Sequence, residues 1–100
     1  MTIGVGGVSR QQALEQLSDM TAGSDPISRQ EFESRISKLQ ALLKQAGVAA
    51  IYLHAGTNLY YFTGLRWSPS ERMVAAIIPA DGPVCYIAPH FELDTLRDYW

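Results

Sequence analysis

The residue types best suited to binding chemistry gather between Asn58 and Arg72. Three aromatic residues are consecutive in this segment, Trp67 follows them, and Arg66 and Arg72 supply positive charge. Aromatic rings and guanidinium groups together recognise small anions, the rings by stacking and the guanidinium by two parallel hydrogen bonds. The alternative is that the aromatic rings only fill space beneath a sheet while Arg72 is solvated. The spacing leaves both interpretations open.

The remaining reactive side chains do not form a pattern that indicates catalysis. His90, Glu92 and Asp94 are close in sequence, but residues two and four apart do not share one helix face, so we interpret them as a helix start that carries acids. We interpret His54 as a solvent-facing loop histidine. The single cysteine, Cys85, lies in an apolar run and is expected to be a buried, inert thiol. We therefore predict no catalytic residue and no metal ligand in this chain.

Helix and strand patterns surround the aromatic segment. Ser28 and Glu31 have the spacing of a reciprocal helix cap, and apolar residues then recur at helical spacing until Gly47, the expected stop. These signals predict a helix over 28–46. Three apolar runs predict strands, the first covered on both faces and the other two joined as a hairpin, at 48–53, 72–78 and 83–88. A last helix is predicted over 89–100.

These elements predict an α/β fold, a small open mixed sheet with a β-hairpin and helices packed on it. The small and polar stretch 21–26 contains glycine and proline and is typical of a linker. It separates an N-terminal extension with a short helix, residues 1–24, from a domain at 25–100. We expect this domain to be truncated at its C-terminal end, because three strands leave two sheet edges unpaired.

Composition restricts the class of protein. The chain has 100 residues, 47% of them apolar and 18% charged, as in a globular domain. A net charge of −2 argues against nucleic acid as a partner. No apolar run approaches the ~20 residues that cross a bilayer, and the N-terminus lacks the pattern of a signal peptide. A cytoplasmic location, without membrane contact, is the expectation.

The order of these features resembles the N-terminal domain of the creatinase/prolidase family, which includes Xaa-Pro dipeptidases and aminopeptidases P. The similarity runs from about Ile27 to Trp100, and its most specific part is the Asn-x-x-Tyr-Phe-Thr-Gly segment at 58–64, followed by Arg72. The resemblance implies a parent hydrolase with a second, catalytic domain that holds two divalent metals, Mn or Co. It also implies that this chain alone is inactive, and that it helps to form a homodimer and shapes substrate access.

The resemblance also implies substrate-binding residues, because creatinases bind the substrate carboxylate with the arginine that matches Arg72. Creatinases have an aromatic residue two positions earlier, where this chain has Ser70, and this difference argues against creatine as substrate. We predict Arg72 as a carboxylate or peptide-end contact, with Trp67 as an aromatic wall and Tyr61 as a further substrate-binding residue. The alternative function is a free-standing module with the same fold, which binds a small carboxylate or serves dimerisation.

Overall fold

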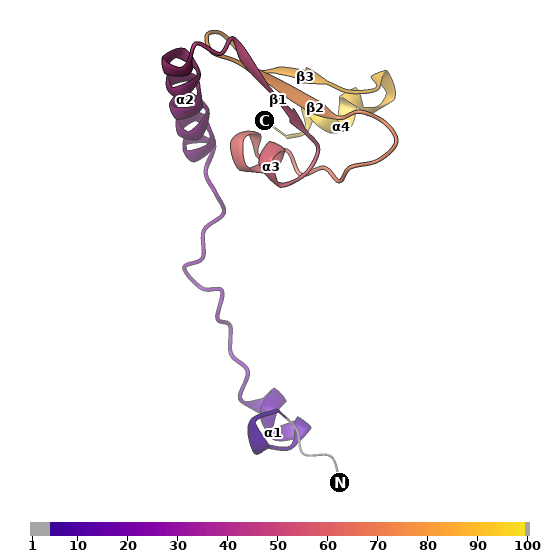
Figure 1. Ribbon diagram of the computed structural model, residues 1–100. Helices are drawn as coiled ribbons and strands as arrows, with labels where there is room; N and C mark the ends of the chain where they lie inside the picture. Colours follow the sequence, from indigo (N-terminus) through magenta and orange to yellow (C-terminus); the bar gives the residue numbers. More distant parts are fainter. Residues whose placement is uncertain (1–4, 100) are drawn as a thin grey trace.

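The structure is a computed structural model that describes residues 5–99 (Figure 1). A short helical turn, η1 (Val5–Gly7), and helix α1 (Arg10–Glu15) lie in the N-terminal extension. The body of the molecule contains the other elements in the order α2 (Arg29–Ala46), β1 (Ala50–His54), α3 (Thr57–Thr63), β2 (Ala75–Pro79), β3 (Cys85–Ile87), η2 (His90–Glu92) and α4 (Leu93–Arg97).

Helix α2 begins and ends where its sequence signals predict. The Ser28 hydroxyl accepts a hydrogen bond from the Glu31 amide at 3.1 Å, which satisfies one of the unpaired amides of the first turn. Gly47 ends the helix with a φ of 68°, a left-handed conformation that only glycine adopts at little cost. The predicted helix is therefore confirmed at both ends.

The sheet has the order β1-β2-β3, and both pairs of neighbouring strands are antiparallel. Strands β2 and β3 form the predicted hairpin, which is thereby confirmed. Helix α2 holds the turn of this hairpin through Gln40, whose Nε2 donates to the carbonyl oxygens of Pro79 and Gly82, each at 2.9 Å. The small open sheet with a hairpin and helices packed on it, predicted from the sequence, is confirmed, but the described strands form an antiparallel sheet and not a mixed one.

Only one face of the sheet is covered by helices. Leu53 of β1 and its register partner Ala76 are buried on that face. The next residue on the other face, Tyr52, is 49% exposed. The prediction that the first strand is covered on both faces is therefore wrong, because the helices all pack on the side of Leu53. Cys85 is paired with Ile77 on the open face and is exposed, so the prediction of a buried thiol is also wrong.

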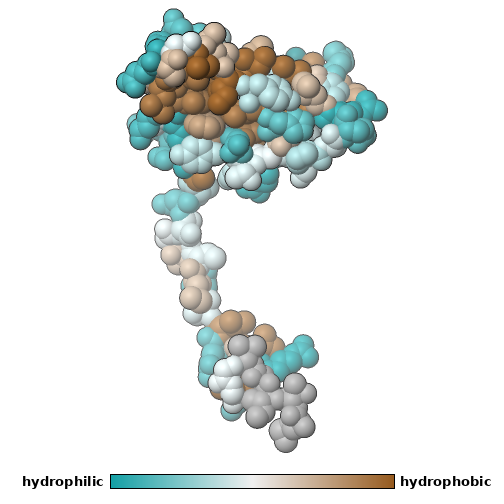
Figure 2. All heavy atoms as spheres, viewed as in Figure 1, coloured by the Kyte–Doolittle hydropathy of each residue, from teal (hydrophilic) through white to brown (hydrophobic). Residues whose placement is uncertain are grey.

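The core lies between the covered face of the sheet, helix α3 and the segment that follows α3. Its most deeply buried large side chains are Leu59, Leu65 and Ile78. Helix α2 adds Phe32 and Leu43 as buried residues, whereas its Leu42 is 61% exposed. Figure 2 shows apolar residues gathered on the body of the molecule, over α2 and the adjoining sheet.

Within the N-terminal extension, residues 6–24 contribute no buried residue to this core. Helix α1 begins with a reciprocal cap, in which Ser9 and Gln12 each bond to the other's backbone amide. The helix is short and its Leu14 is 56% exposed; Leu17 and Met20, which follow the helix, are 70% and 88% exposed. An extended stretch connects α1 to the body (Figure 1). Among the described residues, no helix is long and apolar enough to span a bilayer.

Candidate functional site

The segment 57–64, which carries the most specific sequence motif, folds as helix α3 with a glycine at each end. Gly56 precedes the helix with φ 135° and ψ −160°, a region that is essentially restricted to glycine. Gly64 ends it with a φ of 74°, and its amide donates to the Tyr60 carbonyl at 2.8 Å. The two glycines allow a helix of seven residues to fit between β1 and the segment that leads to β2.

Thr63 joins the end of α3 to the chain that follows. Its fully buried hydroxyl donates to the Leu59 carbonyl at 2.6 Å and accepts from the Leu65 amide at 3.1 Å. The hydroxyl therefore satisfies a carbonyl of the last helical turn and a buried amide just beyond it. This threonine of the motif is explained by its structural position.

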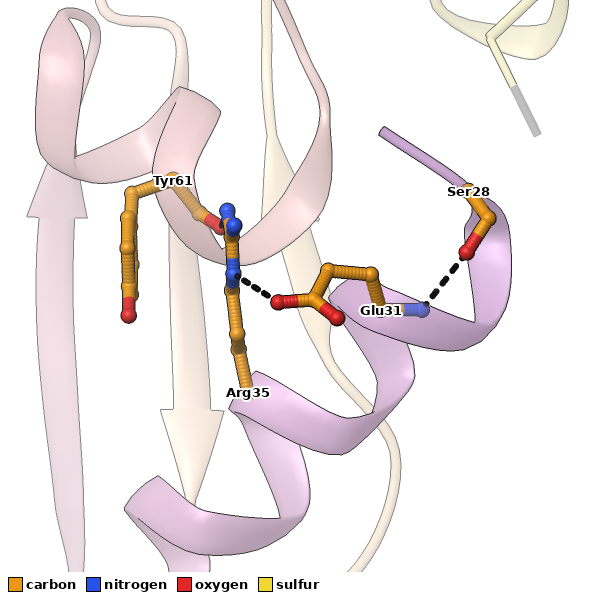
Figure 3. A network of polar contacts seen from close by, with 4 residues as sticks. All are labelled: Ser28, Glu31, Arg35 and Tyr61. Atoms are coloured by element: carbon orange, nitrogen blue, oxygen red, sulfur yellow. Dashed lines mark hydrogen bonds and ion pairs between the residues drawn. The ribbon is translucent and has the colours of Figure 1, made fainter. Parts of the chain in front are cut away.

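Tyr61 is paired with helix α2 through Arg35 (Figure 3). The Arg35 guanidinium lies 4.2 Å from the centroid of the Tyr61 ring, and its Nη1 donates to the Tyr61 carbonyl at 2.9 Å. Its Nε donates to the Glu31 carboxylate at 3.3 Å. In this arrangement Glu31 reaches toward Arg35, one turn further along the helix. The predicted return bond from Glu31 to the Ser28 amide is absent from the hydrogen bonds between described residues.

Arg35 is a residue that sequence reasoning missed. Its side chain is only 18% exposed, and a guanidinium held by a carboxylate, a carbonyl and a ring fixes the position of α3 on α2. The sequence contains one signal, the Glu31–Arg35 pair four residues apart, which is typical of a solvated helix face. Nothing local indicates the bond to a residue 26 positions later.

Trp67 lies in the loop between α3 and β2, beside a shallow pocket of about 270 Å³. The ring is half-buried and packs against the core. Tyr60 and Arg66 also line the pocket, and the Arg66 guanidinium lies 5.5 Å from the Tyr60 ring centroid. The pocket therefore combines two aromatic rings with an exposed cation, the set of groups that suits a small anionic or planar ligand.

Arg72 lies near the end of the same loop, with 60% of its side chain exposed. Its guanidinium carbon is 4.9 Å from the centroid of the Phe91 ring, and its Nε is 3.9 Å from the Glu71 carboxylate. The Ser70 hydroxyl accepts from the Arg72 amide at 3.3 Å and donates to the Arg72 carbonyl at 3.4 Å. Arg72 is thus accessible to a ligand while its backbone is fixed.

The three residues predicted to bind substrate lie in three separate surroundings. Trp67 lines the pocket beside α3, Arg72 contacts Phe91, and Tyr61 contacts Arg35. None of these ring contacts, and not the pocket that Trp67 lines, includes two of the three. Trp67 and Arg72 share the loop between α3 and β2.

A second, more apolar cavity of about 360 Å³ lies beneath β3, between Thr63 and helix α4. Tyr86 lines it, and burial raises the pKa of the Tyr86 phenol above its usual value, while a hydrogen bond with the Thr63 side chain acts in the opposite direction. Tyr99 also lines this cavity, and its hydroxyl donates to the Arg66 carbonyl at 3.0 Å. That bond connects the end of the described chain to the loop that carries Trp67.

Histidine, cysteine and acidic side chains are dispersed over the described part of the chain. Within residues 5–99, no three of them come together in a group that could hold a metal ion. His54 is exposed and its Nδ1 lies 3.1 Å from the Tyr52 hydroxyl. Asp94 pairs instead with Arg97 at 3.4 Å. The described residues therefore do not provide a metal-binding set.

Comparison with known families identifies a match over most of the body. Residues 35–99 match the family described as the creatinase/prolidase N-terminal domain. An uncharacterized peptidase of Staphylococcus aureus strain USA300 is 33% identical over 64 residues, which are 64% of this chain and 18% of the relative. An uncharacterized peptidase of Staphylococcus epidermidis is 28% identical over 64 residues, with the same two coverages.

Two solved structures have a similar fold. Dipeptidase PepE from Mycobacterium ulcerans superposes with a TM-score of 0.68 and 28% identity, covering 74% of this chain and 20% of that one. A recombinant prolidase from Thermococcus sibiricus superposes with a TM-score of 0.64 and 27% identity, covering 76% of this chain and 20% of that one. The chain spans about a fifth of the length of each of these proteins.

Proposed function

This chain belongs to the creatinase/prolidase N-terminal domain family, and on that premise we propose that it is the non-catalytic N-terminal domain of an Xaa-Pro dipeptidase- or aminopeptidase P-like metallopeptidase. The observation that carries the proposal is the match over residues 35–99. The similarity of the body to a dipeptidase and a prolidase supports it. Residues 1–24 are, in this proposal, an extension outside the domain at 25–100.

The catalytic chemistry is assigned to a domain outside these 100 residues. In this proposal two divalent metals, Mn or Co, activate water for attack on the bond before proline in that domain. Residues 5–99 do not fit the role of metal ligands, because they bring no three suitable side chains together. This chain contributes binding surface and the positioning of the substrate's end.

The loop between α3 and β2 is the proposed contribution to substrate access. Arg72 is exposed and its only ion-pair partner among the described residues is Glu71, at the long distance of 3.9 Å. A guanidinium binds a carboxylate through two parallel hydrogen bonds, which fits the free carboxylate of a dipeptide. Trp67 offers an apolar ring in the same loop. We retain Tyr61 as a substrate contact only as a prediction, since Arg35 already occupies one face of its ring.

In the protein that the gene encodes, replacing Arg72 with alanine is expected to raise the KM for an Xaa-Pro dipeptide. A lost hydrogen bond between charged groups corresponds to about a tenfold to hundredfold change, and kcat changes less because the contact is made in the ground state as well. Steady-state hydrolysis of glycyl-proline with Mn²⁺ measures both constants. Arg97→Ala is the matched control, because Arg97 is also exposed and paired with a nearby carboxylate. An unchanged KM would remove Arg72 from the proposed site.

The proposal as a whole is tested by the same assay on the unaltered proteins. Glycyl-proline hydrolysis is measured with the 100-residue chain and with the full gene product, each with added Mn²⁺. We expect activity in the full product alone. Activity in neither protein would contradict the proposal and favour the alternative, a module that binds a small carboxylate at Arg72 or serves dimerisation. The accessible guanidinium of Arg72 is the observation that favours this alternative.

Two further parts of the proposal concern surroundings rather than chemistry. We propose that the parent protein is a homodimer and that this domain contributes subunit contacts; the open face of the sheet, with Tyr52 exposed, is compatible with such a contact. We also propose a cytoplasmic location; the single cysteine of the chain leaves it without an internal disulfide, as is usual in a reducing compartment.

A further inference from the structure

Phe91 is a large apolar side chain that the fold leaves at the surface. It lies in η2, the helical turn that follows β3, and is 63% exposed. Its only ring contact with a cation among the described residues is the Arg72 guanidinium, 4.9 Å from the ring centroid. The two residues come from different segments, one from the loop before β2 and the other from the helical turn after β3.

This contact restricts the guanidinium without using its hydrogen-bond donors. A guanidinium that lies over an aromatic ring is attracted through its face, and its N–H groups remain available at the edge of the plane. An exposed arginine otherwise samples many rotamers, and ordering them costs free energy when a ligand binds. A ring that already holds the group lowers this cost. The backbone of Arg72 is held separately, because the Ser70 hydroxyl hydrogen-bonds with its amide and its carbonyl.

Glu71 is the one carboxylate that pairs with Arg72 among the described residues. The distance from the Glu71 carboxylate to the Arg72 Nε is 3.9 Å, and the Glu71 side chain is 85% exposed. An exposed ion pair at this distance is weak. A ligand carboxylate that makes two short hydrogen bonds to the guanidinium therefore binds Arg72 more strongly than Glu71 does. Such a ligand competes with Glu71 and displaces it.

We propose that Phe91 is a positioning residue that holds the Arg72 guanidinium ready for a small carboxylate, and that Glu71 competes with this ligand for the same donors. The proposal rests on the proposed function only in assigning a carboxylate to Arg72. It adds two residues that set the affinity of Arg72 for a carboxylate. Phe91 raises this affinity through its ring, and Glu71 lowers it through its competing charge.

The test uses the 100-residue chain, labelled with ¹⁵N, and sodium acetate as the carboxylate probe at constant ionic strength. The Nε–H resonance of Arg72 reports both the ring above the guanidinium and the arrival of acetate. We expect Phe91→Leu to shift this resonance and to raise the acetate Kd about two- to fivefold. Phe91→Tyr is expected to restore both values, and Glu71→Gln to lower the Kd by a similar factor.

The Nε–H resonance of Arg35, stacked on Tyr61, is the internal control for folding and stays unchanged in every variant. An Arg72 resonance that Phe91→Leu leaves in place would overturn the proposal, as would a Kd that Phe91→Tyr fails to restore, or no binding of acetate. The result is independent of peptidase activity. An inactive gene product whose Arg72 still binds acetate would refute the proposed function and leave this inference intact.

Discussion

Replacing Leu59 with alanine is expected to lower the free energy of unfolding by about 2–5 kcal/mol. Leu59 is fully buried in α3 and belongs to the central core cluster, where it is surrounded by residues of β1, β2 and the segment after α3. Truncation removes apolar contacts and leaves a cavity that a short helix held at both ends cannot close. Urea denaturation followed by circular dichroism measures the change.

Leu42→Ala is the matched control for this experiment, because the same side chain is 61% exposed on α2. It is expected to change the free energy of unfolding by less than about 0.5 kcal/mol, as is usual for surface substitutions. A loss below that value for Leu59→Ala would mean that α3 does not pack on the sheet as described. A domain of this size has little stability to spare, so Leu59→Ala is measured at low temperature, where partial unfolding is easily recognised.

Replacing Thr63 with valine is expected to lower the free energy of unfolding by about 1–3 kcal/mol, although the two side chains have nearly the same shape. The substitution removes the hydroxyl that accepts from the Leu65 amide, donates to the Leu59 carbonyl and hydrogen-bonds with Tyr86. Because Leu65 is only 2% exposed, its amide is left without a partner in an apolar environment. Thermal and urea unfolding both report the loss.

Thr63→Ser distinguishes the hydroxyl from the methyl group, since serine keeps these hydrogen bonds and is expected to retain most of the stability. Thr57→Val is the control for a valine in the same helix, because Thr57 is exposed. If valine and serine at position 63 were equally destabilising, packing of the methyl group would be responsible, and the hydrogen-bonding explanation of this motif residue would be wrong.

The sequence was sufficient for those elements whose signals are local. Ser28 and Gly47 mark the ends of α2 by chemistry that involves only neighbouring residues, a side-chain cap and a left-handed glycine. The hairpin between β2 and β3 is likewise predicted by a turn that contains proline and glycine between two apolar runs. For the segment of helix α3 the sequence does not distinguish a helical turn from a strand, because four consecutive apolar or aromatic residues fit either period.

Burial could not be predicted where it depends on what packs from a distance. The apolar run before His54 is typical of a strand that is covered on both faces of the sheet. Tyr52 nevertheless faces outward, because every packed helix lies on the other side of the sheet. Cys85 lies in an apolar run too, and it is exposed because β3 is an edge strand and the cysteine is on the open face. Which face is covered follows from the path of the chain, which a residue pattern does not contain.

The sequence predicted which segment carries the candidate site, but not how its side chains are arranged in space. The aromatic and arginine residues between 58 and 72 were identified from their spacing, and the structure divides them between helix α3, which is held on α2, and an exposed loop. The ring that contacts Arg72 belongs to Phe91, which is distant in sequence and has no local feature that indicates the contact. The sequence supplies the groups, while their partners depend on tertiary structure.

The position of β2 has a consequence for how the molecule opens. Among the described strands it alone has a neighbour on each side, and Ala75, Ala76 and Ile78 in it are completely buried. The strands beside it have one unpaired edge each, where local opening exposes amides to water at small cost. Amide protons of β2 therefore exchange with solvent only when the whole body unfolds, so their exchange rates report its global stability, whereas those of β3 report the fraying of an edge.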